Sequence, residues 1–366
     1  MIRKTLPVLA LAGLLLTANA QAQSASALPS ITPLPEKVAA TALAADTQGV
    51  VRFDSRTPFD LDVMLKHYDQ AAPYSGLGHL FLPKGASAKH KVPAMVILPG
   101  SGGIKDGREM AYGKLLSEQG YAAIIIDYYS PRGVTEDAPY ALKASTVSEF
   151  DVVADAYAAL RMLNQHPAVD ARRIGVMGFS RGGIATRLAM DERIKSALAA
   201  DLPGFALHVD YYGPCFQEFG TSKTTGAPLL SLRGAADVTN DLEQCARREH
   251  QLRLGGSKVG SQIYADAGHS WENLEARHTN DLTYVNGCDV VYDEGGMPTI
   301  AGRTMIPAST PLDRASRFQL RITSGRYYVG CLHKGYIVGR DEPVKQESDR
   351  QLIGFLDQVF NGAKHY

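Results

Sequence analysis

Short apolar runs alternate with amphipathic stretches along most of the chain. The runs predict strands at residues 94–98, 121–126, 173–177, 208–212, 229–233 and 261–264, with two antiparallel-type strands earlier, at 49–54 and 78–82. Apolar residues at helical spacing lie between and after them, at Phe150, Val153, Tyr157 and Leu160, and again at Leu352, Phe355, Leu356 and Val359. This alternation predicts an α/β fold, with a mostly parallel central sheet and helices on both faces.

Local signals place the boundaries of two helices. Gly120 ends a helix expected over residues 109–119, and Pro167 follows the end of the next helix. That second helix is expected to begin with a capping box formed by Thr146 and Glu149, whose side chains satisfy free N–H groups of the first turn.

The stretch from about residue 276 to residue 343 interrupts the alternation. Strands are expected at residues 289–293 and 317–323, with a turn at Gly295 and Gly296. In a minimal α/β fold the last strand would lead directly to the C-terminal helix. We therefore interpret 276–343 as a β-rich insertion within one domain that spans residues 23–366. The insertion either overhangs the functional site or decorates the fold, and the sequence leaves both options open.

Residues 178–182 read Gly-Phe-Ser-Arg-Gly and stand between a predicted strand and a predicted helix. This context is typical of a nucleophile elbow, in which a sharp turn presents a serine at the end of the sheet. Gly178 and Gly182 leave room where the turn crowds its neighbours, and Gly183 lets the helix approach the strand closely. Ser180 is the expected nucleophile, close to free backbone N–H groups that favour developing negative charge.

A serine nucleophile needs a general base and an orienting acid, which follow it along the chain in this kind of site. Asp237 comes soon after the predicted strand at 229–233, and His269 soon after the strand at 261–264. Both would lie at the same edge of the sheet as Ser180. We predict His269 as the base and Asp237 as the acid.

Other residues of the same types compete for these roles. Asp241 and Asp266 are alternative acids, although either can instead cap a helix or a turn. The alternative histidines are His208, His250 and His278. They stand at a strand start, in a charged helical run and beyond the core pattern, respectively. His269 is favoured because it follows a glycine at a strand exit.

An oxyanion hole is expected in the loop after the strand at 94–98, which reads Pro99-Gly100-Ser101-Gly102-Gly103. A backbone N–H of this loop, from Ser101 or alternatively from Gly102, would act together with the N–H of Arg181. A plain glycine-rich turn is the alternative interpretation of the loop.

Taken in order, these motifs resemble those of dienelactone hydrolase-like proteins in the α/β-hydrolase superfamily. The segments that carry the resemblance are residues 99–103, 127–134, 166–170 with 173–174, 178–183, 234–237 and 268–269. The resemblance spans roughly residues 75–272 and the last twenty. It implies the α/β-hydrolase fold and a hydrolase activity.

The chain departs from this family pattern at two places. The namesake enzymes have a cysteine at the elbow, where this chain has Ser180, so the resemblance does not carry over dienelactone as the substrate. The usual His-Gly before the oxyanion loop is Pro99-Gly100 here, so the resemblance does not define the detailed structure of that loop.

Two residues near the expected site are candidates for substrate binding. Arg132, like Arg181, could hold a substrate carboxylate or could instead anchor a loop. Trp271, the only tryptophan, could line the acyl pocket or fill the core beside His269.

Charge and cysteine content narrow the class of protein. Lys plus Arg and Asp plus Glu each total 38 and are interspersed, which argues against nucleic acid or a membrane surface as a partner.

Four cysteines predict two disulfides in an oxidising compartment, with three possible pairings. We favour Cys215–Cys245, since both follow consecutive core strands, and Cys288–Cys331, which would close the insertion. Their spacing does not suit a metal site.

Residues 1–22 have the pattern of a signal peptide. Arg3 and Lys4 precede an apolar run at 6–17, and alanine-x-alanine cleavage sites follow it. The apolar run is too short to span a bilayer comfortably. We therefore expect export to the periplasm or outside the cell, with a retained membrane anchor as the alternative.

The sequence thus predicts an exported serine hydrolase that cleaves carboxylic esters or lactones through an acyl-enzyme and needs no cofactor. Its expected partner is a small-molecule ester or lactone substrate. A serine peptidase or amidase of the same fold is one alternative. A binding protein that retains the pocket without the chemistry is another.

Overall fold

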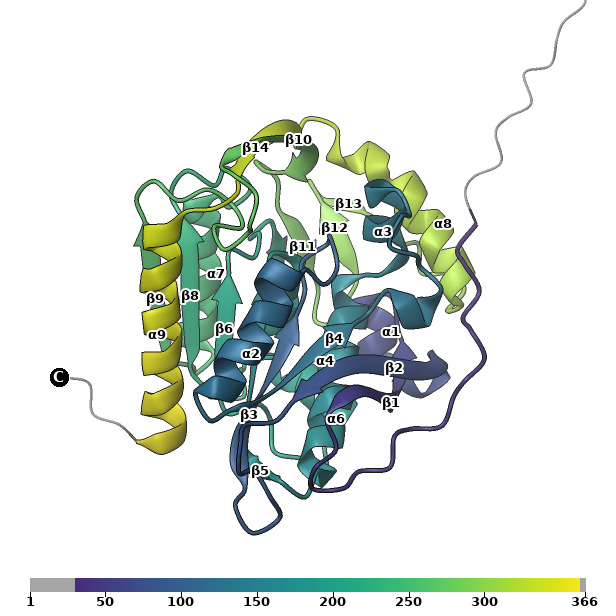
Figure 1. Cartoon of the computed structure of the whole chain (residues 1–366). Coiled ribbons are helices and arrows are strands. Elements are labelled where there is room, and N and C mark those ends of the chain that lie inside the picture. The colour runs from purple at the N-terminus through teal and green to yellow at the C-terminus, as the bar shows by residue number, and fades with distance from the viewer. Residues whose placement is uncertain (1–29, 363–366) are drawn as a thin grey trace, which may run out of the picture.

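An eight-stranded sheet forms the centre of the computed structural model, which describes residues 30–362 (Figure 1). The strand order is β1-β2-β4-β3-β5-β6-β8-β9. The strands are β1 (Gly49–Thr57), β2 (Ala72–Phe81), β3 (Val92–Leu98), β4 (Ala122–Asp127), β5 (Val169–Phe179), β6 (His208–Tyr211), β8 (Leu229–Gly234) and β9 (Val259–Tyr264). β2 pairs antiparallel with β1 and β4, and all other neighbours are parallel. The predicted α/β class is confirmed.

Helices cover both faces of this sheet. Side chains alternate between the faces along a strand, so Met95 and Ile97 join one buried cluster while Val96 and Leu98 join the other. The first face is covered by α2 (Ala111–Glu118) and α9 (Glu342–Asn361), and the second by α4 (Glu149–Gln165), α5 (Arg181–Leu188) and α6 (Glu192–Ala199). This layering leaves the carboxyl ends of the parallel strands free to carry loops.

The start of α4 differs from the prediction. Ser148 is its N-cap: the Ser148 hydroxyl accepts a hydrogen bond from the Asp151 N–H at 3.0 Å, and the Asp151 carboxylate accepts one from the Ser148 N–H at 2.9 Å. The predicted capping box of Thr146 and Glu149 is wrong. Thr146 instead ends a short helix, α3 (Tyr140–Thr146), which the apolar pattern did not reveal.

The insertion between residues 276 and 343 adds two small sheets and a helix. Its elements are β10 (His278–Val285), β11 (Val290–Tyr292), β12 (Pro298–Ile300), β13 (Arg303–Thr304), α8 (Arg314–Ser324) and β14 (Leu332–Val338). β10 and β14 form an antiparallel pair, and β11 extends a second sheet onto β7 (Gln217–Glu218) of the main domain. In Figure 1, β10 and β14 lie along the top of the molecule, and α8 runs down its upper right side.

Helix α8 corrects the strand predicted at 317–323. Alternating apolar and polar residues there fit the period of a strand, which is the reason for the wrong prediction. The helix forms because Asp313 caps it, its carboxylate accepting a hydrogen bond from the Ser316 N–H at 2.9 Å. Phe318 is then fully buried on the inner side of the helix.

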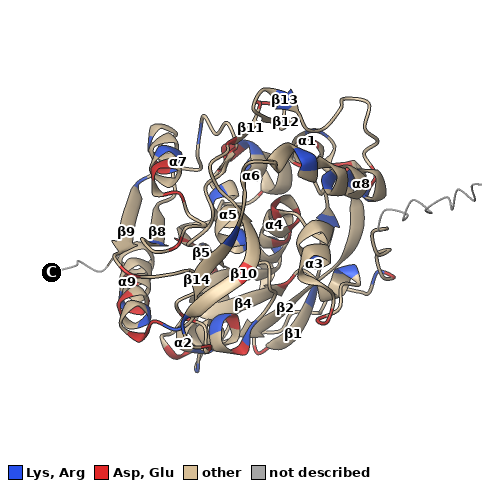
Figure 2. Ribbon diagram, turned by 90° about the horizontal axis from the view of Figure 1, so that it is seen from above, with Lys and Arg blue, Asp and Glu red and all other residues tan. Residues whose placement is uncertain are grey.

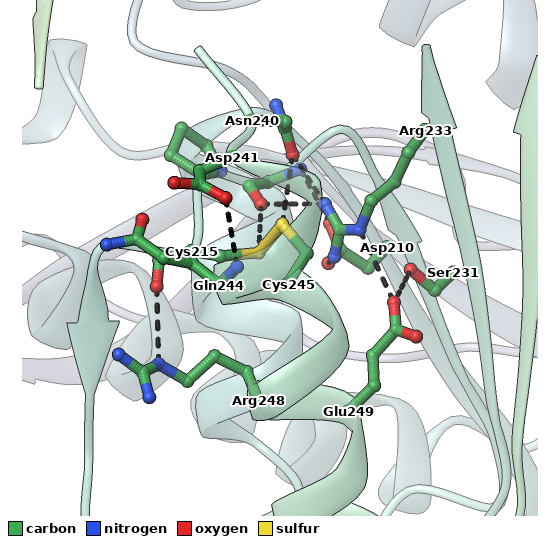
Figure 3. The surroundings of a disulfide bond; sticks show 12 residues. Asp210, Cys215, Ser231, Arg233, Asn240, Asp241, Gln244, Cys245, Arg248 and Glu249 are labelled. Carbon is green, nitrogen blue, oxygen red and sulfur yellow. Dashed lines mark hydrogen bonds and ion pairs between the residues drawn. A yellow bond between two sulfur atoms is a disulfide. The ribbon is translucent and has the colours of Figure 1, made fainter. Parts of the chain in front are cut away.

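Both cysteine pairs favoured from the sequence are disulfides in the structure. Cys215, after β6, bonds Cys245 on α7 (Leu242–Leu254), with the Cα atoms 5.0 Å apart. Figure 3 shows this bond among the charged residues at the start of α7. Cys288 bonds Cys331 within the insertion, with a Cα separation of 5.7 Å. Within residues 30–362 no cysteine is free, and no group of three or more potential ligands could hold a metal ion.

Replacing Cys215 and Cys245 by serine should lower the free energy of unfolding by about 3 kcal/mol, because the bond closes a loop with a sequence separation of 30. Urea unfolding of the variant and the unreduced parent measures this difference. Peptide mapping without reductant should recover both cross-linked pairs. Four free thiols in the purified protein would contradict the disulfide assignment.

Charges of both signs are spread over the molecule, as the view from above in Figure 2 shows. None of the helices between residues 30 and 362 combines the length and the apolar character that crossing a bilayer requires. The signal peptide predicted at 1–22 lies outside the described residues.

Candidate active site

Ser180 occupies the sharp turn between β5 and α5. Its backbone has φ 54° and ψ −112°. Residues other than glycine rarely adopt this backbone conformation, and they do so where the surrounding structure imposes it. The neighbouring glycines make the turn possible. A Cβ at Gly178 would collide with the backbone of Gly182, and a Cβ at Gly182 would collide with the carbonyl of Leu98. The local structure is therefore the strand–elbow–helix predicted from the sequence.

His269 and Asp237 come together at the same edge of the sheet. Asp237 follows β8 and is buried, and its Oδ2 lies 2.7 Å from Nδ1 of His269, which follows β9. The ring therefore engages the acid through Nδ1, which leaves Nε2 as the nitrogen that can exchange a proton with a substrate or nucleophile.

Hydrogen bonds from two neighbours hold the Asp237 carboxylate in place. Its Oδ1 accepts from the Thr239 N–H at 3.0 Å and from the Thr239 hydroxyl at 2.7 Å. Its Oδ2 accepts from the Asn240 amide at 2.9 Å. The carboxylate is thus fixed against the imidazole in the way that an orienting acid requires.

Ser180, His269 and Thr239 line one cavity of about 830 Å³. Ser101 and Arg181, the residues predicted to supply the oxyanion hole, line the same cavity. The elbow, the histidine loop and the loop at 99–103 therefore open onto a single space, large enough for a small-molecule ester.

The loop at 99–103 is held through its carbonyl groups. The hydroxyl of Tyr128 donates to the carbonyl of Gly100, and the hydroxyl of Tyr129 donates to that of Ser101 at 2.8 Å. The guanidinium of Arg181 donates to two backbone carbonyls, those of Val147 and Ala144. The part of Arg181 that remains for an oxyanion hole is its backbone N–H.

The alternative acids and histidines lie elsewhere. Asp241 caps α7 by accepting from two backbone N–H groups, and Asp266 is exposed in a turn. His250 is exposed on α7 and His278 is exposed at the start of β10. His208 is fully buried in β6, and this burial lowers its pKa to about 4.

Arg132 and Trp271 are not among the residues that line the cavity, and their contacts support the alternative role of each. The guanidinium of Arg132 is completely buried, pairs with Asp155 at 2.7 Å and lies over the ring of Tyr74. Trp271 is also completely buried, and its indole N–H donates to the hydroxyl of Ser348 at 3.1 Å. Arg132 anchors a loop and Trp271 fills the core, which were the alternative roles considered for each.

A buried polar cluster behind His269 was not predicted from the sequence. The ring of Tyr212 lies 4.5 Å from the imidazole, and its hydroxyl donates to Glu272, whose pKa is raised by burial. Arg108 lies 3.8 Å from Glu272 and donates to the Ser270 hydroxyl at 3.3 Å. These residues come from three separate segments, a helical turn at 106–110 and two loops, and they share no sequence spacing. The only signal in the sequence was the adjacent charged pair at 108–109, just before a predicted helix.

Strand β14 of the insertion is joined directly to the histidine loop. The His269 N–H donates to the carbonyl of Ile337 at 2.7 Å, and the ring of Tyr336 stands edge-on to the imidazole at 5.6 Å. Residues of β10, β14 and α8 line the same cavity as Ser180. The insertion therefore forms part of the wall of the site.

This chain is similar to several known proteins. A probable 2-oxo-3-(5-oxofuran-2-ylidene)propanoate lactonase of a Bradyrhizobium species is 26% identical over 195 residues, which are 50% of this chain and 74% of that protein. The solved structure of a thermophilic esterase from Thermogutta terrifontis, with propionate bound, is 16% identical, with a TM-score of 0.43, over 57% of this chain and 83% of that one. Residues 78–293 match the dienelactone hydrolase family. With more than half of its length matched, the chain belongs to the dienelactone hydrolase family.

Proposed function

We propose that Ser180, His269 and Asp237 form the catalytic triad with which this chain hydrolyses a carboxylic ester or a lactone. Membership of the dienelactone hydrolase family makes the chain a carboxylic ester hydrolase. The main support for this triad is that Ser180, in its strained turn, and His269, bound to Asp237, line the same cavity. These are the parts that acyl transfer through a serine requires.

In the proposed reaction, the Ser180 hydroxyl attacks the acyl carbon while Nε2 of His269 takes its proton. The tetrahedral intermediate collapses as the same proton passes to the leaving alkoxide, which departs as an alcohol and leaves an acyl-enzyme. A water molecule then repeats the sequence, with His269 again as base, and releases the acid and free Ser180. With a lactone, alcohol and acid remain in one hydroxy-acid product.

The developing oxyanion would be stabilised by the backbone N–H groups of Arg181 and Ser101. The N–H of Arg181 is at the first turn of α5, where the helix has free donors. The carbonyls of the oxyanion loop are already bound by Tyr128 and Tyr129, so the loop keeps one shape through the reaction. Preorganised donors of this kind lower the barrier because no reorganisation is needed.

The test of this function is a panel of esters, lactones and peptide amides measured as kcat/KM. The proposal expects turnover of p-nitrophenyl acetate and of simple lactones, with far slower cleavage of amides. Preferential cleavage of peptide amides would favour the peptidase alternative. Loss of all turnover, with a ligand still bound in the cavity, would favour the binding protein.

We also propose that the protein acts in the periplasm or outside the cell. Two disulfides are compatible with an oxidising compartment, and the first 22 residues have a signal-peptide pattern. The mass of the N-terminal peptide of the protein recovered from its native cells tests this proposal. Cleavage near residue 22 supports it, and an intact Met1 contradicts it.

Shortening the insertion should change substrate selectivity. Val285 and Leu332 are partners in the β10–β14 pair, so residues 287–331 can be replaced by a two-residue turn that keeps the support of His269. We expect kcat/KM for a bulky ester to fall about tenfold or more, with a smaller effect on p-nitrophenyl acetate, because the insertion excludes water and contacts the remote part of the substrate.

The deletion removes the arginine partners of Glu149, Asp60 and Asp62, so it is combined with Glu149→Gln, Asp60→Asn and Asp62→Asn. Leu320→Trp, which fills the same side of the cavity without a deletion, is the second variant. An unaltered ranking of esters in both variants would show that the insertion is decoration.

A further inference from the structure

The arginines of the inner cavity wall are already occupied by protein groups. Arg317 pairs with Asp60 at 3.3 Å and with Asp62 at 3.0 Å, and Arg321 pairs with Glu149 at 3.3 Å. The Arg181 guanidinium is held by two backbone carbonyls. At these arginines a substrate carboxylate would therefore have to compete with bonds that the protein already makes, at a cost in desolvation. Lys334 also lines the cavity, but it is exposed to solvent, where pairing with a carboxylate contributes little.

Aromatic rings make up much of the remaining wall. The cavity is lined by Tyr140, Phe216, Tyr284, Tyr292, Tyr328 and Tyr336. Three rings form a continuous path: the imidazole of His269 lies 5.6 Å from the ring of Tyr336, which lies 5.7 Å from the ring of Tyr284. Both pairs meet edge to face, at interplanar angles of 86° and 79°. The path leads from the reacting atoms along the β10–β14 pair of the insertion.

The rings of this path are partly accessible. Tyr284 and Tyr336 are half-buried, and both contribute surface to the cavity that contains Ser180. A flat ring next to them would meet ring edges and faces at the separations that aromatic pairs prefer. The volume of about 830 Å³ admits a ring together with the ester group.

We propose that the substrate is an uncharged ester that carries an aromatic ring, and that this ring packs against Tyr284 and Tyr336. The proposal rests on the proposed function, since it assigns a substrate class to the same site. The ring is placed a few atoms from the ester carbonyl, because the path starts at His269 and extends outward along the insertion.

Matched ethyl esters test this assignment without altering the reactivity of the carbonyl. The series is ethyl butyrate, ethyl 3-cyclohexylpropanoate, ethyl 3-phenylpropanoate and ethyl 3-(4-carboxyphenyl)propanoate. We expect kcat/KM for the phenyl ester to exceed that for the cyclohexyl ester about threefold or more and that for the carboxylate-bearing ester about tenfold or more. The acetates of 2-phenylethanol and 2-cyclohexylethanol show whether the ring belongs to the acyl or to the alcohol side.

Two substitutions then locate the ring. Tyr284→Leu keeps an apolar side chain but removes the aromatic face, so the ratio of phenyl to cyclohexyl kcat/KM should fall towards one. Tyr284→Phe should keep the ratio. Val329→Ala is the control, because Val329 is 80% exposed near the start of β14 and does not line the cavity. Circular dichroism checks that each variant is folded, and the ester series on the unaltered protein stands by itself if one is not.

The possible outcomes separate this inference from the proposed function. Equal kcat/KM for phenyl and cyclohexyl esters on both the acyl and the alcohol side, or a preference for the carboxylate-bearing ester, would overturn the inference while leaving an esterase. No cleavage of any ester or lactone, or equal cleavage by Ser180→Ala, would overturn the proposed function itself. A phenyl preference that Tyr284→Leu leaves unchanged would overturn the assignment to this wall.

Discussion

Replacing Ser180 by alanine should lower kcat on p-nitrophenyl acetate by about 10⁴-fold or more and leave the fold intact. The hydroxyl is the only group at the elbow that can form the acyl-enzyme, so its removal leaves only the binding and oxyanion contributions. The fold should survive because the strained turn is maintained by the glycines around it and not by the serine side chain, which makes no capping hydrogen bond.

The measurement is kcat over a range of substrate concentrations, with circular dichroism and thermal unfolding as controls for structure. The Ser180→Ala/His269→Ala double variant adds a second check, because residues that act as a unit are not additive and the double variant should be no slower than either single variant. Residual activity within about tenfold of the parent in Ser180→Ala would show that another residue is the nucleophile.

Replacing His269 by alanine should reduce kcat nearly as much as Ser180→Ala, and Asp237→Asn should cost somewhat less, about 10³-fold. The Asp237 Oδ2 accepts a hydrogen bond from Nδ1 of His269 at 2.7 Å. An asparagine amide can instead donate to Nδ1, which places the ring proton on Nε2 and prevents that atom from acting as the base. The His269 ring can therefore keep its position while its proton is on the wrong nitrogen.

Asp241→Asn is the matched control for this prediction. It makes the same change four positions away, on a carboxylate that caps α7. It should cost at most about 1 kcal/mol of stability and leave kcat unchanged. Equal effects of Asp237→Asn and Asp241→Asn on kcat would remove Asp237 from the triad.

The sequence predicted the sheet and the position of its chemistry because both depend on local patterns. Each core strand is a short apolar or β-prone run, and Ser180, Asp237 and His269 each stand within a few residues of a strand end. In a parallel sheet the carboxyl ends share one edge, so the proximity of these side chains follows from their placement along the chain. The structure brings His269 and Asp237 into contact and places Ser180 on the same cavity.

The features that the sequence did not predict depend on long-range packing. The residues around Arg132 in the sequence suggested a position at the edge of the site. Arg132 is instead buried, because it pairs with Asp155, which lies 23 positions later on a helix. The cluster of Tyr212, Arg108 and Glu272 joins two loops and a helical turn that no periodic pattern connects. The apolar and polar residues of segment 317–323 alternate with the period of a strand. The segment is nevertheless helical, and Asp313 caps the start of that helix.

The catalytic role of Ser180 is tested most directly by labelling the folded protein with a fluorophosphonate probe, followed by peptide mass spectrometry. A fluorophosphonate phosphonylates an activated serine and releases fluoride, so it reports the nucleophile and its base together. We expect one equivalent of label on the peptide that contains Ser180, none in Ser180→Ala and much slower labelling in His269→Ala. Absence of label on the folded protein, or label on a serine other than Ser180, would contradict this role.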